Sequence, residues 1–295
     1  METKVEKTNN IGTSNNTKLI NKLGEGSKKI ALYILLIVLT GICLIPFYIM
    51  IIDATHTNGE IASKLWILPG TALLDNYHRL TESVDIWRGF ANSVFIAVAT
   101  TAVSGYFSAL TAYGFSKYKF KGNKALYAIV LGSMMIPMQL GFIGFYQLIN
   151  KMNLLNSYIP LIIPAIANAS SVFFIKGYTD GAVNISLIEA GRIDGCSEFS
   201  IFNKIALPLI VPSIATMSIF TFIGTWNSYL TPLILISDME KYTLPIMQVV
   251  SRGVYKTEFG TIYTCIAISV VPVMIAFAFL SKKIIGGLTI GGVKG

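Results

Sequence analysis

Long apolar segments without charged residues constrain the fold of this chain more than any other feature of its sequence. Each is about 20 residues or longer, and about 20 residues of helix cross the roughly 30 Å hydrocarbon core of a bilayer. None of them contains Asp, Glu, Lys, Arg or His in its interior. The predicted spans cover about residues 30–52, 90–115, 125–149, 157–175, 206–236 and 261–281.

The composition excludes an ordinary soluble domain. Charged residues make up 13% of the 295 residues and hydrophobic residues 53%, whereas soluble domains carry about 25% charged residues. The apolar runs are continuous, unlike the alternating segments of about ten residues that form membrane β-strands. We therefore predict an all-α, polytopic membrane protein with six transmembrane helices. The fifth span contains Pro208, Pro212 and Pro232, which predict that part of it is tilted or broken.

The distribution of positive charge predicts the orientation. Sixteen of the 23 lysines and arginines fall before the first span, in the second and fourth connections, and after the last span. Cytoplasmic segments hold such an excess, so both termini are expected in the cytoplasm. Residues 1–29 form a polar, disordered cytoplasmic tail in this scheme, residues 30–285 the transmembrane domain, and residues 286–295 a cytoplasmic tail. The charges are spread along one membrane face, so no nucleic-acid partner is expected.

The sequence lacks several residue patterns that mark catalytic, nucleotide-binding or ion-coupling sites. No ionisable residue lies at membrane depth, where a proton- or sodium-coupled carrier usually needs one, although backbone carbonyls of broken helices can also bind sodium. No Gly-Lys pair occurs, which excludes the usual phosphate-binding loop. His56 and His78 lack further ligands at metal-binding spacing. We expect no catalytic residue, cofactor or metal, and the energy for active transport would come from a partner.

The connection 176–205 is too long to be a bare link between two spans. Ser186 and Glu189 are spaced as in a capping box, which predicts a short helix that begins near Leu187. Gly195 is suited to end this helix in the left-handed conformation, and a further turn or two would lead into the next span. We predict a helical elbow whose small residues could enter a groove on another protein. The alternative is an interfacial helix that only links two spans.

The same connection resembles the EAA loop of permeases of ATP-binding-cassette (ABC) importers. That loop reads Glu-Ala-Ala, three residues, Gly, nine residues, Ile, one residue, Leu-Pro. The matching residues here are Glu189, Ala190, Gly195, Ile205, Leu207 and Pro208, with Gly191 in the third position and Asp194 before the glycine as in many members. Gly191 and Cys196 depart from the usual alanines, but both are small.

Three further segments resemble the carbohydrate permeases of that family. Residues 222–233 resemble their Trp-Asn segment and residues 242–245 the short outer-loop motif that follows it. Residues 287–295 look like the tail of the maltose-permease-like subunit with six spans. The resemblance covers the chain after residue 29. It implies the type I permease fold of ABC importers and a role as one permease subunit of an ATP-driven, binding-protein-dependent importer of a sugar or oligosaccharide.

The resemblance also implies partners and residue roles. The partners are a second permease subunit, a dimeric cassette ATPase that uses ATP and Mg, an extracytoplasmic sugar-binding protein and the membrane lipid. The elbow helix would sit in a cleft of the ATPase. There Glu189 would cap its helix and offer a carboxylate to a basic group, and Arg192 and Asp194 would be rim charges. The small residues Ala190, Gly191 and Gly195 would permit close approach.

The sugar path is expected to use aromatic, amide and hydroxyl side chains. The candidates are Gln139, Asn168, Trp226, Asn227 and Tyr229. The two aromatic residues could instead belong to the belt at the membrane interface, and Gln139 and Asn168 could bond neighbouring helices. In this family one subunit of the pair can supply most of the sugar contacts, so this chain could supply few.

Three alternative functions are weighed against a sugar importer. The first is an ABC importer permease for another solute, such as glycerol phosphate, a peptide or an amino acid. The second is a standalone facilitator or secondary carrier, which the elbow motif and the missing intramembrane charges disfavour. The third is a membrane scaffold without transport. The sequence does not indicate which sugar is carried.

Overall fold

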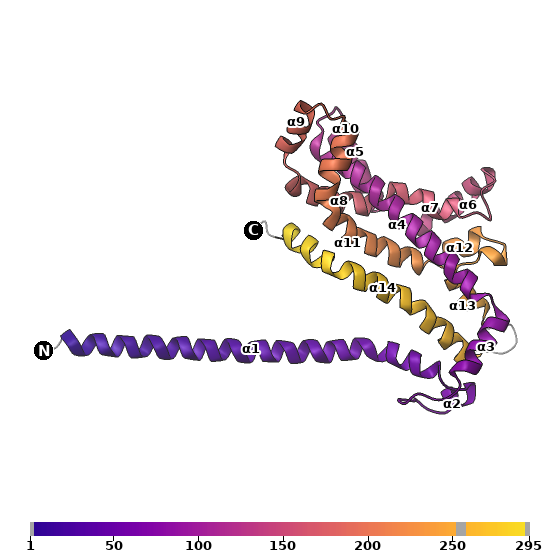
Figure 1. The fold of residues 1–295 in the computed structure, drawn as a ribbon, viewed down its shortest axis with the longest axis horizontal. Helices are drawn as coiled ribbons and strands as arrows, with labels where there is room; N and C mark the ends of the chain where they lie inside the picture. The colour runs from indigo at the N-terminus through magenta and orange to yellow at the C-terminus, as the bar shows by residue number, and fades with distance from the viewer. Residues whose placement is uncertain (1–2, 252–257, 293–295) are drawn as a thin grey trace.

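The computed structural model describes residues 3–251 and 258–292, and within these ranges the chain is helical without any strand. The long helices are α1 (Thr3–Asp53), α4 (Ile86–Lys117), α8 (Ala169–Ala182), α11 (Leu207–Trp226) and α14 (Phe259–Gly292). Shorter elements are α2 (Asn58–Ser63), α3 (Leu73–Ser83), α7 (Ile159–Ile162), η2 (Ile163–Ala167), α12 (Leu230–Leu235), η4 (Met239–Lys241) and α13 (Leu244–Val250). Figure 1 shows α1 apart from the others along most of its length, whereas α4, α8, α11 and α14 form a bundle.

Close packing of α4 against α8 and α11 forms the centre of this bundle. The inner face of α4 carries small residues, and Ser104, Gly105, Ser108, Ala109 and Ala112 are all buried. A Cβ atom on Gly105 would lie 3.2 Å from Cγ2 of Ile214 on α11. Small side chains let helix backbones approach closely inside a membrane, where packing replaces the hydrophobic effect as the driving force.

Five helical segments are long and apolar enough to cross a membrane, judged by length and composition within the described residues. They are Lys28–Asp53, Ile86–Lys117, Ile159–Ala182, Glu198–Trp226 and Phe259–Ala278. The predicted span 125–149 is instead divided into α5 (Asn123–Ser133), η1 (Met138–Gly141) and α6 (Phe142–Lys151). The chain becomes extended at Pro137, with φ −61° and ψ 126°, because proline interrupts helical hydrogen bonding. Six crossings remain compatible with this arrangement.

The predicted span 206–236 is broken, as its length and prolines indicated. Helix α11 ends at Trp226 and α12 begins at Leu230. The break covers residues 227–229 and does not coincide with a proline, since Pro212 lies within α11 and Pro232 within α12. Residues 227–229 therefore place irregular backbone inside an apolar segment, which membrane proteins tolerate where protein or a water-filled cavity surrounds it.

Both ends of the chain differ in secondary structure from the expected tails. Helix α1 begins at Thr3, inside the segment 1–29, and α14 continues to Gly292, inside the segment 286–295. Extending an existing helix needs no new nucleus, so polar residues next to an apolar span can continue its helix. The location of these ends in the cytoplasm stays a prediction.

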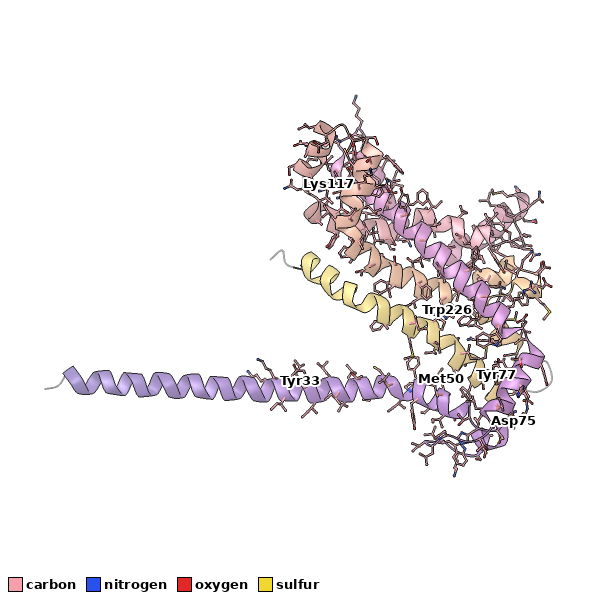
Figure 2. The ribbon with its side chains drawn as sticks, viewed as in Figure 1. Tyr33, Met50, Asp75, Tyr77, Lys117 and Trp226 are labelled. Carbon is pink, nitrogen blue, oxygen red and sulfur yellow. The ribbon has the colours of Figure 1, made fainter. Side chains whose placement is uncertain are left out.

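Trp226 anchors the core between α11 and α14 (Figure 2). Its side chain is buried, and its indole Nε1 donates a hydrogen bond to the carbonyl oxygen of Ser269 at 3.1 Å. The ring stacks on Phe222, with centroids 6.0 Å apart, and meets the edge of Phe90 at 5.7 Å. Trp226 thus acts as a core residue in this structure, with only 3% of its surface exposed.

Replacing Trp226 by alanine should lower the free energy of unfolding by about 3–5 kcal/mol, the usual cost of removing a large aromatic side chain from a core. The measurement is unfolding of the purified protein in detergent. Trp87→Ala is the matched control, because the Trp87 side chain is half exposed, at 51%. Equal losses in the two variants would contradict the core role of Trp226.

Candidate functional site

The predicted elbow is a compact unit of α9 (Ile185–Ile193), α10 (Glu198–Ile201) and the π-helical turn η3 (Phe202–Ala206), which leads directly into α11. Figure 1 shows α9 and α10 side by side at one end of the bundle, where α4 also ends. We call residues 184–206 the elbow and this end of the molecule the elbow end. The elbow therefore projects from the bundle where a partner could reach it.

The beginning of α9 differs from the expected capping box. Asn184 is the N-cap, and its side-chain oxygen accepts a hydrogen bond from the backbone N–H of Ser186 at 3.1 Å. The helix begins at Ile185, so Ser186 already lies inside its first turn and Glu189 is its fifth residue. Asparagine is among the best N-cap residues, and it takes the position that we assigned to Ser186. The predicted capping role of Glu189 is therefore wrong.

The end of α9 is as predicted. Gly195 adopts a left-handed conformation with φ +77°. Its N–H donates to the carbonyl of Arg192 at 3.0 Å, and the N–H of Cys196 donates to the carbonyl of Gly191 at 2.9 Å. These two bonds form a Schellman motif, which satisfies the last carbonyls of a helix. Ser197 then caps α10 by accepting from the N–H of Ser200 at 3.3 Å.

Gly191 faces the protein's own interior rather than a partner. It is buried, and a Cβ atom there would lie 3.0 Å from Cδ1 of Ile205 and 3.1 Å from Cγ1 of Ile201. These contacts explain why glycine stands at this position of the motif: α9 packs directly on α10 and η3. The close approach that we expected Gly191 to offer a partner is used within the chain.

The outward face of α9 carries apolar side chains that are exposed among the residues that the structure describes. Leu187, Ala190 and Ile193 follow one another at three-residue spacing, which places them on one side of a helix. All three are exposed, and Ile193 is 86% exposed. Glu189, Asp194 and Gly195 are also exposed beside them. Contiguous exposed apolar side chains mark protein-interaction surfaces.

Sequence analysis identified Ala190 but missed Leu187 and Ile193. The signal was present in the helical period. Leu187, Ala190 and Ile193 recur at three-residue spacing and are exposed, whereas Ile188 and Gly191 are buried on another side of α9. We call Leu187, Ala190 and Ile193 the docking face.

Arg192 is paired within the chain and is not a free rim charge. Its Nε donates to Oε1 of Glu198 at 2.6 Å and its Nη2 to Oε2 at 3.2 Å. The hydroxyl of Tyr118, at the end of α4, donates to the same carboxylate, and the Arg192 guanidinium lies 5.8 Å from the centre of the Tyr118 ring. Burial and the hydrogen bond to Glu198 raise the pKa of Tyr118 above its usual range, so Tyr118 keeps its proton. We call these three residues the elbow clamp.

Apolar packing holds the elbow to the bundle more strongly than the elbow clamp does. The side chains of Arg192 and Glu198 are 43% and 52% exposed, and such pairs contribute about 0–1 kcal/mol. Ile188, Ile201 and Phe202 are almost fully buried in one cluster with Tyr113 of α4, and each such side chain contributes about 1.5–3 kcal/mol. The cluster fixes the elbow in place, and the clamp sets its orientation against α4.

The last motif residues lead from the elbow into α11. Ile205 and Leu207 are half-buried and pack against the same cluster. Pro208 is exposed at the start of α11, and the π-helical turn before it ends with the N–H of Leu207 donating to the carbonyl of Phe202. This turn therefore joins the elbow to α11 without an interruption.

The candidate sugar-path residues occupy different structural positions. Asn168 is the N-cap of α8, and its side chain accepts from the N–H of Ser171 at 3.0 Å, so it caps its own helix rather than bonding to a neighbouring one. Gln139 is exposed in η1, and Asn227 and Tyr229 lie in the break after α11. Within the described residues, no hydrogen bond involves the side chains of these last three.

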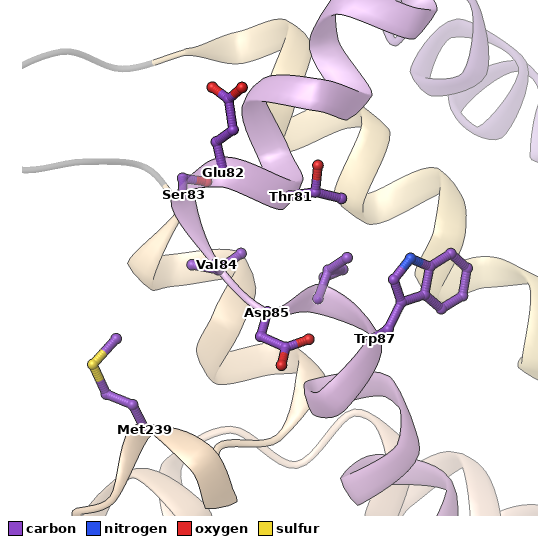
Figure 3. A pocket seen from close by; sticks show the side chains of 8 residues that line it. Thr81, Glu82, Ser83, Val84, Asp85, Trp87 and Met239 are labelled. Carbon is purple, nitrogen blue, oxygen red and sulfur yellow. The ribbon is translucent and has the colours of Figure 1, made fainter.

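An open pocket at the opposite end of α4 does not resemble a ligand site. It lies where α3 leads into α4 (Figure 3), with a volume of about 280 Å³, below the usual 300–1,000 Å³ of ligand pockets. Asp85 in its wall caps α4 by accepting from the N–H of Arg88 at 3.1 Å. Met239 faces it from the other side. The pocket therefore marks the contact between the start of α4 and η4.

Gly191→Leu should loosen the elbow, because the added side chain collides with Ile201 and Ile205, and overpacking typically costs 1–3 kcal/mol. The measurement is hydrogen exchange of the backbone amides of residues 185–206, which should become faster. Ala190→Leu is the matched control, since this side chain points outward. Unchanged exchange in Gly191→Leu would show that Gly191 does not face the interior.

The comparisons with known proteins agree with the geometry of the elbow. Residues 101–285 match the family described as binding-protein-dependent transport system inner membrane component. The chain is 37% identical to an arabinooligosaccharides transport system permease protein, AraQ, of Halalkalibacterium halodurans, over 77% of this chain and 81% of that protein. It is 33% identical to a polygalacturonan/rhamnogalacturonan transport system permease protein, YtcP, of Bacillus subtilis, over 90% and 97%.

A solved structure has the same fold. It is a bacterial ABC transporter involved in the import of the acidic polysaccharide alginate, with a TM-score of 0.74 and 22% identity over 86% of this chain and 95% of that one. The family match covers more than half of the sequence and includes the whole elbow. This chain therefore belongs to the family of inner membrane components of binding-protein-dependent transport systems.

Proposed function

We propose that this chain is one permease subunit of an ATP-driven importer of oligosaccharides. The elbow carries the proposal, because an exposed docking face on a firmly packed helix is suited to receive force from another protein. Relatives with 37% and 33% identity are named as permeases for arabinooligosaccharides and for polygalacturonan or rhamnogalacturonan, which supports a carbohydrate as the substrate. The subunit itself performs no covalent chemistry.

The partners in this proposal are a second permease, a dimeric cassette ATPase and an extracytoplasmic sugar-binding protein. The ATPase holds ATP and Mg and hydrolyses the nucleotide. The excess of lysine and arginine at the elbow end supports a cytoplasmic location, so the docking face would enter a cleft of the ATPase. Glu189 is exposed beside this face, and no ion pair within the described residues involves its carboxylate. It is free to pair with a basic group of the partner.

Transport would follow from alternating access. Closure of the ATPase dimer on ATP would carry the elbows of both permeases with it and turn the cavity between the permeases outward. The break at residues 227–229 is the best candidate in this chain for sugar contact. Asn227 and Tyr229 bring amide and hydroxyl groups to membrane depth there, and such groups match the hydroxyls of a sugar.

Co-purification tests the proposal directly. The tagged chain, extracted from its native membrane in mild detergent, should bring down a second permease and a cassette ATPase, and the complex should hydrolyse ATP. Both partners should be identified by mass spectrometry. Recovery of the chain alone, or only as a homo-oligomer, would contradict the importer function and favour a standalone carrier.

Ala190→Phe should abolish binding of the ATPase while the permease still folds, because Ala190 lies in the middle of the docking face. We expect at least a tenfold loss of co-purified ATPase, since a bulky ring forced into a close-packed contact typically costs about 1–3 kcal/mol. Lys121→Phe is the matched control: Lys121 is also exposed, in the connection between α4 and α5. If Ala190→Phe recovers as much ATPase as the wild type does, the ATPase does not bind at the docking face.

A further inference from the structure

Helix α4 joins the elbow to a segment at the opposite end of the molecule. In Figure 1 it runs through the bundle from the region of α3 and α13 to that of α9 and α10. It has 32 residues without an internal proline, so it is about 48 Å long at 1.5 Å per residue. Its packing against α8 and α11 along the way makes bending costly. A displacement at one end must therefore appear at the other.

Polar and aromatic contacts attach the elbow end of α4. The hydroxyl of Tyr118 donates to Glu198, and the hydroxyl of Tyr106 donates to Oδ1 of Asn203 at 3.2 Å. The rings of Tyr113 and Phe202 lie 5.4 Å apart between centroids. Movement of the elbow thus reaches α4 through contacts with both α10 and η3.

The other end of α4 holds the segment Met239–Leu244, which we call the far segment. Nδ2 of Asn92 donates to the carbonyl oxygens of Glu240 and Tyr242, both at 2.9 Å. The buried hydroxyl of Ser93 accepts from the N–H of Leu244 at 2.8 Å. These bonds join side chains of α4 to backbone atoms of the far segment. They therefore fix the backbone path of the far segment independently of its side chains.

An ion pair and a close helix contact also join this end of α4 to its neighbours. Arg88 pairs with Glu240 at 3.0 Å, but their side chains are 48% and 73% exposed, so the pair contributes little. A Cβ atom on Gly89 would lie 2.7 Å from Cγ of Met247, which shows how closely α13 lies on α4. Asn92 and Ser93 are therefore the main polar links.

We propose that α4 transmits movement between the elbow and the far segment, with Asn92 and Glu198 as positioning residues at its two ends. The inference rests on the proposed function, since the force at the elbow comes from the ATPase. With the elbow in the cytoplasm, the far segment lies on the outer face. Nucleotide binding on one side of the membrane would then change the far segment on the other.

Asn156 provides a matched control because it holds the far segment without α4. Its side-chain oxygen accepts from the N–H groups of Ser237 and Asp238 at 3.3 and 3.1 Å. Its Nδ2 donates to the carboxylate of Asp238, and its carbonyl accepts from Nζ of Lys241 at 3.0 Å. Asn156 has φ +56°, which glycine also adopts without strain. Asn156→Gly thus removes the side-chain bonds to Ser237 and Asp238, directly before the far segment, while leaving α4 untouched.

The test is hydrogen exchange of residues 239–250 in the complete complex in lipid nanodiscs, with and without Mg and the non-hydrolysable ATP analogue AMP-PNP. In the wild type the analogue should change the exchange rate at least about fivefold, the lower end of ordinary coupling between distant sites. Asn92→Leu should abolish this response, and Glu198→Gln, which leaves the apolar packing of the elbow intact, should reduce it. Asn156→Gly should alter the rate without nucleotide but keep the response.

The outcomes separate this inference from the proposed function. A complex that contains no ATPase refutes the proposed function. A complex that binds AMP-PNP but shows no response in the wild type, or a full response in Asn92→Leu, overturns the role of α4. If Asn92→Leu fails to assemble, Ser93→Ala removes a smaller part of the same contact and should reduce the response.

Discussion

Close packing of α4 against α8 and α11 is the interaction on which the rest of the structure depends. It is possible because the inner face of α4 is built from small residues such as Gly105 and Ala109. The same face continues into Ala112 and Tyr113, which pack on the elbow. One helix thus organises the bundle and supports the elbow. Its lack of an internal proline gives it the stiffness that both roles need.

The elbow combines a fixed inner face with a free outer face. Gly191, Ile201 and Phe202 are buried, so α9 is held against the bundle by apolar packing. Leu187, Ala190 and Ile193 remain exposed on the other side. A surface that transmits force needs both properties. If the elbow were loosely attached, it would move without displacing the bundle. If the docking face were buried, a partner could not bind to it. Arg192 and Glu198 add direction, since a bidentate pair fixes the geometry of its partners.

Local rules predicted the parts of the structure that depend on local interactions. The apolar runs predicted the helices, and Gly195 predicted the end of α9, because only a left-handed residue closes a Schellman motif. The N-cap was misplaced because Asn184 and Ser186 both suit that position, and packing of Ile188 and Gly191 decides which residue begins the helix. The division of span 125–149 at Pro137 was missed, because spanning length and hydropathy do not report the path of the backbone.

The interactions between distant segments could not be predicted in the same way. Arg192 was expected at a rim, yet it pairs with Glu198 across the turn that ends α9, and Tyr118 from the distant helix α4 donates to the same carboxylate. Trp226 looked suited to bind sugar, but Ser269, far along the sequence, takes its indole N–H. Nothing in the local pattern of either residue identifies such partners. Sequence reasoning therefore located the elbow and named most of its motif. It could not tell which of these side chains contact the interior of the chain and which remain exposed.

The central claim is that the docking face of α9 contacts a cassette ATPase. The most direct measurement is site-specific photocrosslinking in the native membrane, with the photoreactive residue at position 193 and, for comparison, at position 121. The account predicts a crosslink from position 193 to a cassette ATPase, identified by mass spectrometry, and none from position 121. Crosslinking of position 193 to lipid alone would contradict it.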